Sequence, residues 1–416
     1  MKQTDFIKMR KWYLVCGCIT MLFSGVIYAW SILKTPFSME FQWNPSQLAV
    51  NYSIMMACFC IGGLLGSRIS GRFGLRTALL CSAVLVLGGF SLTARLSGNI
   101  LLLYLSYGGM GCLGIGIMYN VVISTMSMCF PDKKGSVTGL LLMCYGASSL
   151  LMGNGLSMLI ESKAVGWRNT YQILGILLAI VLTAAALILR RPSEEDKIPV
   201  ISGQHPGKVR ELQMFGRELT TKQMLWGSLF WISFLFFVTA SCASQAVISF
   251  AKDYLLTLGA SAVTVNTQVG MLSICSGLGR ILSGCLCDRL GCMKTMAIAD
   301  SVTVLGSVMG VISVLTGIHG LGLAVICVIG LSAGMVPVLT SNYTNLAFGS
   351  RDFSANLGWM NFAVIPASFA PTLAAMLNGD GSFLKPFGML VFTSLAAVGL
   401  HICLQYQLNC RACDEA

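Results

Sequence analysis

The sequence predicts an all-α polytopic membrane protein with twelve transmembrane helices, arranged as two pseudo-symmetric six-helix bundles. Hydrophobic residues make up 55% of the 416 residues and charged residues only 10%, whereas a soluble domain carries about 25% charged residues. Apolar stretches of about 20 residues, long enough for a helix to cross a hydrocarbon core of about 30 Å, recur along the whole chain. The longest polar stretch falls between the sixth and seventh of them.

The apolar pattern predicts spans at residues 12–33, 46–67, 77–94, 99–124, 136–160, 168–189, 225–249, 264–286, 294–316, 321–343, 355–378 and 386–407. The first is longer than the apolar region of a cleavable signal peptide and no A-x-A site follows it, so we expect it to remain as a span. We expect an N-terminal bundle over residues 1–189, a cytoplasmic central loop over 190–222 and a C-terminal bundle over 223–416.

The basic residues behind the formal net charge of +11 are distributed as membrane topology requires, so the charge does not indicate a nucleic-acid surface. If the N-terminus is cytoplasmic, most Lys and Arg residues fall in the inside segments, including Lys8 to Lys11, Arg68 to Arg76 and Arg190 to Lys222. This asymmetry is the positive-inside pattern, which predicts a multi-pass protein of a bacterial inner (plasma) membrane with both termini in the cytoplasm. The expected partner is the lipid bilayer, with no nucleic acid.

Neither the cysteines nor the glycine motifs predict a metal site or a cofactor. Most of the 17 cysteines lie inside apolar spans, where a free thiol behaves as a small hydrophobic side chain. Cys410 and Cys413 form a C-x-x-C, but no second ligand pair accompanies it. A literal G-x-G-x-x-G runs from Gly109 to Gly114 in the middle of a span, without the preceding strand that a dinucleotide site needs. We expect those glycines to serve close helix packing.

The two halves of the chain resemble each other in the turns between spans. The segment from Gly66 to Thr77 reads G-S-R-I-S-G-R-F-G-L-R-T, and the segment from Gly284 to Thr295 reads G-C-L-C-D-R-L-G-C-M-K-T. Aligned on Gly74 and Gly291, both have arginine two residues before the glycine, at an offset of 217 residues. Internal repeats of this kind are typical of secondary carriers, whose substrate sites lie near the bilayer midplane.

The turn after the eighth span resembles the G-x-x-x-D-R-x-G-x-x-[RK] loop of the major facilitator superfamily, through Gly284, Asp288, Arg289, Gly291 and Lys294. The N-terminal copy departs from it, because Gly71 stands where the acid is expected. Three longer segments are similar to the oxalate/formate antiporter family, a branch related to monocarboxylate transporters. They are F-S-G-V-I-Y-A-W-S in the first span, C-F-P-D-K-K-G after the fourth and G-L-G-R-I-L-S-G in the eighth.

This resemblance implies an arginine on the eighth span and a lysine on the eleventh, which together hold the two charges of oxalate. Arg280 matches the arginine, but Val364 stands where the lysine is expected. Of the aromatic residues that would surround the anion, Tyr28 and Tyr119 match. The other two positions fall on Ala333 and Pro337.

The position of Arg280 predicts a functional role independently of the resemblance. It lies eight residues before Asp288, which at about 1.5 Å per residue is about 12 Å inside the end of its span. An arginine at that depth costs at least about 2.5–3.5 kcal/mol, so it should face a water-filled cavity or a partner. A structural arginine bonded to backbone carbonyls or to an acid is one interpretation. We favour contact with a substrate carboxylate, which the guanidinium can bind through two hydrogen bonds.

Four further charged residues are candidates for coupling or gating. Asp300 lies about six residues into the ninth span and could carry a proton, or pair with Arg280 or a base on the cytoplasmic side. We favour a pairing role, because water from the interface would still reach that depth. Asp288 and Arg289 belong to the turn motif. Lys34 ends the first span, where it could draw anions or anchor the helix at the interface.

Uncharged polar side chains inside spans are the remaining candidates for substrate contact. Tyr28 and Tyr119 lie near the middle of their spans or beyond it, whereas tyrosines that anchor a helix in the lipid interface lie at its ends. We expect both to line the substrate cavity. Weaker candidates, which could equally bond to a neighbouring helix, are Asn51, Asn120, Gln245, Gln268, Asn342 and Asn361.

Together these features predict a secondary active transporter for small organic anions that works by alternating access as a monomer. It needs no cofactor, and protons are a candidate second partner. An enzyme is not expected, since His205, His319 and His401 lie in the central loop, an outer loop and the last span. A membrane sensor or receptor would need an output domain, and only a short tail follows the last span. With one cation at the site, we expect monocarboxylates to be preferred. Oxalate/formate exchange is the alternative.

Overall fold

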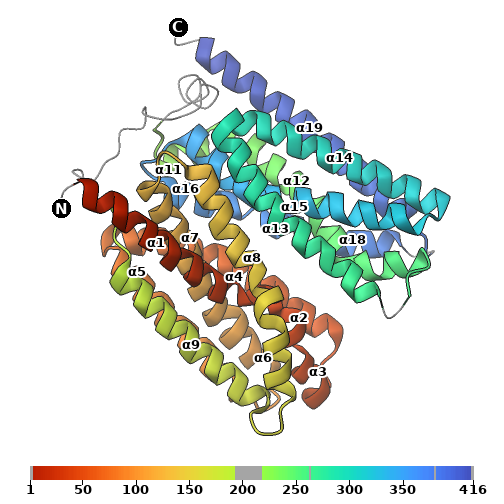
Figure 1. The fold of residues 1–416 in the computed structure, drawn as a ribbon, viewed down its shortest axis with the longest axis horizontal. Helices are drawn as coiled ribbons and strands as arrows, with labels where there is room; N and C mark the ends of the chain where they lie inside the picture. Colours follow the sequence, from red (N-terminus) through yellow and green to blue (C-terminus); the bar gives the residue numbers. More distant parts are fainter. Residues whose placement is uncertain (1–2, 193–217, 262–263, 379–380, 414–416) are drawn as a thin grey trace. The chain divides into compact units, whose positions relative to one another are not determined.

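The computed structural model describes residues 3–192, 218–261, 264–378 and 381–413, which form helices joined by short turns, with no strand among them (Figure 1). Twelve helical segments of this described part are long and apolar enough to cross a membrane, and each overlaps one predicted span, with ends that differ by at most eight residues. The prediction of an all-α protein with twelve spans is therefore confirmed. Most of the predicted central loop, residues 193–217, lies outside the described residues.

The chain divides into two compact units. Unit 1 comprises Met1–Asp132, Leu140–Val200 and Leu357–Trp359, and unit 2 comprises Lys133–Gly139, Ile201–Asn356 and Met360–Ala416. The elements before the central segment are α1 (Gln3–Ser24), η1 (Gly25–Ala29), α2 (Trp30–Leu33), α3 (Thr35–Phe41), α4 (Pro45–Arg72), α5 (Leu75–Thr93), α6 (Ile100–Leu103), η2 (Tyr104–Gly111), α7 (Cys112–Cys129), α8 (Lys134–Glu161) and α9 (Gly166–Ile188). Those after it are α11 (Thr221–Trp226), α12 (Ser228–Thr257), α13 (Val265–Leu290), α14 (Cys292–Thr316), α15 (His319–Phe348), α16 (Phe353–Asn361), α17 (Val364–Ala367), α18 (Ala370–Leu377) and α19 (Leu384–Cys413).

The predicted repeat appears as equal backbone geometry at the two turn glycines. Gly74, between α4 and α5, has φ 89° and ψ 166°. Gly291, between α13 and α14, has φ 94° and ψ 166°. A side chain at such a positive φ would clash with the backbone, so only glycine adopts this turn without strain. The two turns are therefore structural copies, as the sequence offset predicts.

In unit 1, the repeat extends to a pair of helices that touch through glycine. A methyl group added at Gly62 on α4 would meet the carbonyl oxygen of Leu113 on α7, and one added at Gly116 would meet the carbonyl oxygen of Phe59. Glycine at both positions lets the two backbones approach more closely than any side chain permits. On the neighbouring face of α7, Ser82 Oγ donates to the carbonyl of Gly114 at 2.7 Å, so the glycine motif of this span serves packing.

Unit 2 repeats the same contact between α13 and α15. A methyl group at Gly279 would meet the carbonyl oxygen of Leu331, and one at Gly334 would meet the carbonyl oxygen of Ser276. Each of these four residues follows its counterpart in unit 1 by 217 or 218 positions. The offset read from the turn motifs therefore extends through the spans themselves.

Two spans are less regular than the apolar pattern predicts. The fourth span passes through the π-helix η2 before α7 begins, and such segments are frequent at functional sites. The eleventh span is divided into α16, α17 and α18. Pro366 and Pro371 explain the breaks, because proline lacks the N–H that would continue the hydrogen-bond ladder and its ring crowds the preceding turn.

The end of the predicted central loop is tied to unit 2. The carboxylate of Glu218 accepts hydrogen bonds from the backbone N–H groups of Ser350, at 3.1 Å, and Arg351, at 2.7 Å, in the turn between α15 and α16. Burial would raise the pKa of Glu218, but these hydrogen bonds outweigh it and hold the pKa below its ordinary value. The next residues form α11, whose N-cap Thr220 accepts from the N–H of Gln223.

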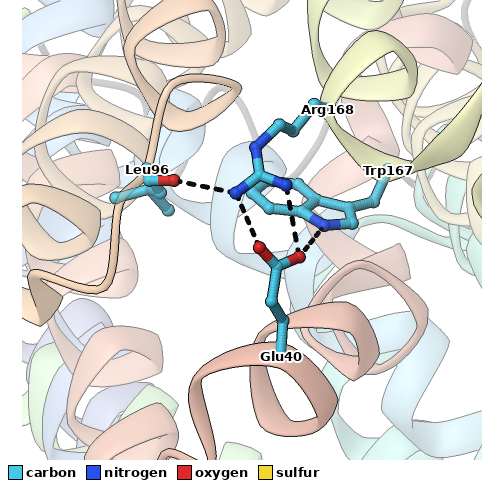
Figure 2. A network of polar contacts seen from close by, with 4 residues as sticks. All are labelled: Glu40, Leu96, Trp167 and Arg168. Atoms are coloured by element: carbon cyan, nitrogen blue, oxygen red, sulfur yellow. Dashed lines mark hydrogen bonds and ion pairs between the residues drawn. The ribbon is translucent and has the colours of Figure 1, made fainter.

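An ion-pair network joins three segments of unit 1 (Figure 2). Glu40 on α3 accepts hydrogen bonds from Arg168 Nη2 at 2.6 Å, Arg168 Nη1 at 3.3 Å and Trp167 Nε1 at 2.6 Å. Arg168 Nη2 also donates to the carbonyl oxygen of Leu96 at 3.2 Å. These contacts hold α3 and the α5–α6 turn against the start of α9, and the hydrogen bonds from Arg168 lower the pKa of Glu40.

The variant Glu40→Gln is expected to lower the free energy of unfolding by up to about 1 kcal/mol at pH 7, the upper value for a partly exposed ion pair. Because the folded state holds the Glu40 pKa below its ordinary 4.5, this contribution is fully present above pH 4.5 and is lost as the pH falls through the folded pKa. Thermal unfolding in detergent across a pH series measures it. The midpoints of wild type and variant should converge at low pH, and Glu161→Gln, an exposed glutamate on α8, is the control. A difference between the unfolding midpoints of wild type and Glu40→Gln that stays constant at low pH would contradict this account.

Candidate functional site

Arg280 lies near the middle of the span Thr267–Leu290 and is only 9% exposed. Its carbonyl oxygen accepts from Ser283 Oγ at 3.2 Å. A methyl group at Gly139 on α8 would meet the same carbonyl, and one at Gly135 would meet the carbonyl of Gly284. The first turns of α8, which belong to unit 2, thus pack directly on the backbone that carries Arg280. This contact fixes the helix segment from which the guanidinium extends.

Asp288 caps the first turn of α8. Its Oδ1 accepts from the backbone N–H of Gly135 at 3.0 Å, and its Oδ2 accepts from the N–H and the Oγ of Ser136, both at 2.7 Å. The first N–H groups of a helix have no partner within it and carry partial positive charge, so a carboxylate stabilises them. The neighbouring Arg289 is exposed, with no ion pair among the described residues. A gating role for either residue stays a prediction.

Asp300 is buried, and its partner is a histidine that the sequence argument did not connect with it. Its Oδ2 lies 2.6 Å from Nδ1 of His401, with the two side chains 8% and 7% exposed. The expectation that water from the interface reaches Asp300 does not match this burial. A pairing role with Arg280 or with a base on the cytoplasmic side was favoured for Asp300, and the structure pairs it with His401, not with Arg280.

On α7, Tyr119 and Asn120 are both buried in unit 1. The ring of Tyr119 packs edge-on against Phe59, with centroids 5.0 Å apart, and against Tyr145, at 5.2 Å. Asn120 Nδ2 donates to the carbonyl of Gly63 on α4 at 2.8 Å, which is the bond to a neighbouring helix considered for the weaker candidates. The aromatic group around Tyr119 therefore includes Tyr145 on α8, which the sequence argument missed. The only sequence signal for Tyr145 was its position in the middle of a predicted span.

The other candidate residues lie on several different elements of the two units. Asn361 is half-buried at the end of α16, where the eleventh span breaks, and Val364 opens α17 just beyond. Lys34 is half-buried between α2 and α3, and its carbonyl accepts from the N–H groups of Phe37 and Ser38. The side chain of Tyr28, in η1, lies outside the described residues. Arg280 and Asn361 thus belong to unit 2, and Tyr119, Asn120 and Lys34 to unit 1.

The structure therefore defines a membrane protein of twelve spans in two repeated units, and among the described residues one arginine is buried at mid-span. A profile of the Major Facilitator Superfamily matches residues 13–400. The chain belongs to this superfamily, and several of its relatives are named as transporters.

Among curated proteins, the chain is 26% identical to the uncharacterized MFS-type transporter YhjX of Escherichia coli over 351 residues, covering 84% of this chain and 83% of that protein. It is 23% identical to the oxalate:formate antiporter of Oxalobacter formigenes over 412 residues, covering 96% and 92%. It is 27% identical to human monocarboxylate transporter 11 over 330 residues, covering 77% and 63%. The resemblance stated from the motifs is confirmed.

Solved structures show the same fold. The transporter FucP in an outward conformation has a TM-score of 0.71 at 12% identity, covering 94% of this chain and 98% of FucP. The proton:xylose symporter XylE has a TM-score of 0.67 at 17% identity, covering 94% and 95%.

Proposed function

We propose that this chain is a secondary active transporter that moves small organic carboxylate anions across the plasma membrane by alternating access, with Arg280 binding the carboxylate. The observation that carries the proposal is the burial of Arg280 at mid-span. A guanidinium placed there needs an anion or strong acceptors, and a carboxylate matches its two parallel donors. The names of two relatives, an oxalate:formate antiporter and a monocarboxylate transporter, point to the same class of substrate.

Monocarboxylates should be preferred, because the described spans offer one deeply buried guanidinium and Val364 occupies the position where the resemblance implies a lysine. One guanidinium neutralises one carboxylate. A bound dianion would keep a second negative charge in a medium of low dielectric constant, which is costly. Lactate, pyruvate and formate therefore fit the site better than oxalate.

Oxalate/formate exchange is the second candidate. Its support is the similarity to the oxalate:formate antiporter over almost the whole length of both proteins. This function would require a second cation near the substrate, supplied from outside the eleventh span.

The other assignments follow from the same proposal. Tyr28, Tyr119, Asn120 and Asn361 would contact the organic part of the substrate, and Asp288, Arg289 and Lys34 would act in gating. The positive-inside pattern supports cytoplasmic termini. We propose that the protein transports as a monomer.

Competition in proteoliposomes tests the substrate class. Purified protein is reconstituted with internal unlabelled lactate, and entry of labelled lactate is measured in the presence of excess pyruvate, formate, oxalate or a neutral sugar. We expect pyruvate and formate to compete at least tenfold better than oxalate, and the sugar to have no effect. Strong inhibition by oxalate with none by pyruvate would favour the exchanger. Absence of any carboxylate counterflow would refute the anion-carrier proposal.

A further inference from the structure

A groove in the surface of unit 1 lies between α5 and α9, two helices that run side by side (Figure 1). It has a volume of about 340 Å³ and is lined by Leu87 on α5 and by Ile176, Ala179, Ile180 and Thr183 on α9. Thr183 Oγ1 donates to the carbonyl of Ala179 at 2.7 Å, so the hydroxyl donor is already used. The groove therefore presents an apolar surface, which suits a hydrocarbon chain better than a polar ligand.

The depth of the groove corresponds to one half of the bilayer. Thr183 and Ile176 precede Ile188, where the α9 span ends, by five and twelve residues, which is about 7.5 and 18 Å along the helix. Because half of the hydrocarbon core is about 15 Å thick, the groove extends from below the headgroups of one leaflet to the midplane. Ile176 and Ile180 are exposed, so the described part of the chain leaves the groove open to lipid.

The end of unit 1 toward which this groove leads is basic. Gln172 Nε2 donates to Ser91 Oγ at 3.1 Å, and a methyl group added at Gly175 would lie 3.6 Å from the carbonyl oxygen of Leu87. These contacts show that α9 runs antiparallel to α5, so α9 ends beside the start of α5. The arginines at this end are Arg68, Arg72, Arg76, Arg190 and Arg191. Because α4, α5 and α9 contain no Asp or Glu, a negatively charged lipid headgroup complements this end.

Arg191, just after α9, is half-buried and only partly satisfied by the protein. Its Nη2 donates to Ser70 Oγ on α4 at 2.9 Å, whereas its Nε is buried and has no hydrogen-bond partner among the described residues. Burial lowers the pKa of Arg191, because it disfavours the charged guanidinium. An anion beside the guanidinium offsets this cost, and phosphate is an anion that the planar donors of arginine match.

Arg76 connects the basic end with the groove. It precedes Leu87 by eleven residues, which is about three helical turns, so both side chains lie on one stripe of α5. The separation along the helix is about 16.5 Å, close to the half-thickness of the hydrocarbon core. Leu80, between them on the same stripe, is exposed. Arg76 is exposed as well and forms no ion pair with a described residue. A lipid whose chain reaches Leu87 therefore has its headgroup at the level of Arg76.

We propose that this end of unit 1 binds one anionic phospholipid, with an acyl chain in the α5–α9 groove and its phosphate held by Arg76 and Arg191. Phosphatidylglycerol carries both features, an acyl chain and a single uncompensated negative charge. A zwitterionic lipid would bring a cationic group to a surface that already carries several positive charges. The site does not depend on the proposed function of Arg280, because its residues all lie in unit 1 and Arg280 lies in unit 2.

Thermal unfolding of the purified protein in a neutral detergent tests the site without a transport assay. Phosphatidylglycerol should raise the unfolding midpoint in a saturable way, whereas phosphatidylcholine with the same chains and water-soluble glycerol phosphate should not. Arg76→Gln and Arg191→Gln should each raise the phosphatidylglycerol concentration at half-maximal shift by about tenfold, the effect of losing one charged hydrogen bond. Arg95→Gln, an exposed arginine at the opposite end of α5, is the control and should leave that concentration unchanged.

A matched pair of variants tests the groove itself. Ala179→Phe fills it, whereas Ala184→Phe places the same side chain at an exposed position of α9 that does not line it. We expect only Ala179→Phe to weaken binding of phosphatidylglycerol, by about tenfold or more. If Ala179→Phe proves less stable without lipid, Arg76→Gln, at an exposed position, still decides the test.

Three results would overturn the proposal. One is equal stabilisation of the wild type by phosphatidylcholine, and another is a response of Arg76→Gln and Arg191→Gln that matches that of Arg95→Gln. The third is a wild-type protein that is dimeric and insensitive to phosphatidylglycerol, but becomes monomeric in Ala179→Phe. That result would assign the groove to a second copy of the chain.

Discussion

Replacing Arg280 by glutamine is expected to reduce carboxylate uptake at least about 100-fold. Each hydrogen bond between charged groups contributes about 1.5–3 kcal/mol, and a carboxylate held by both donors of the guanidinium would lose two of them. Because about 1.4 kcal/mol corresponds to a factor of ten, the loss of two such bonds exceeds two orders of magnitude. Glutamine also removes the positive charge at mid-span, so a bound anion would remain uncompensated.

Arg280→Lys distinguishes the effect of the positive charge from the effect of the planar pair of hydrogen-bond donors. Lysine keeps the positive charge but offers a point donor in place of the planar pair, so we expect a loss of about tenfold, which is smaller than that of Arg280→Gln. Lys252→Gln, at the exposed end of α12, is the matched control and should transport at the wild-type rate. Uptake is measured at equal amounts of monodisperse protein. If Arg280→Gln retained uptake within a few-fold of wild type, Arg280 would not be part of the substrate site.

Valine at Gly279 or at Gly62 is expected to destabilise the protein by about 3 kcal/mol or more, the upper end of the cost of overpacking. A side chain at Gly279 would overlap the carbonyl oxygen of Leu331, and one at Gly62 would overlap that of Leu113. In both cases the obstructing atom belongs to a helix backbone. It cannot rotate away as a side chain can, so α13 must separate from α15, or α4 from α7.

Each of these helices provides its own control. Gly270 on α13 and Gly71 on α4 have no atom within 4 Å of an added methyl group. Gly270→Val and Gly71→Val should therefore unfold at the wild-type temperature, measured by thermal unfolding in detergent, while Gly279→Val and Gly62→Val unfold at a clearly lower one. Equal midpoints for all four variants would show that the close backbone contacts do not determine stability.

The spans and the repeat could be predicted because their signals are local. A run of about 20 apolar residues identifies a span whatever it packs against. The turn motif at Gly291 reflects a backbone conformation that only glycine adopts easily. Arg280 was identifiable for the same reason, since its distance from Asp288 along one helix sets its depth in the span. The division of the eleventh span was signalled by Pro366 and Pro371, but an apolar run alone predicts a continuous helix.

The sequence by itself determined the class of the protein, the number of spans, the repeat and the single arginine at mid-span. Only the tertiary structure decided which side chains meet. Asp300 and His401 are 101 residues apart, Glu40 and Arg168 are 128 apart, and Asp288 caps a helix that begins more than 150 residues earlier. Hydrophobic periodicity reports whether a residue lies in a span, but it does not report which helix lies opposite. That choice depends on how glycine contacts and side-chain volumes fit several helices together, which no local stretch of sequence contains.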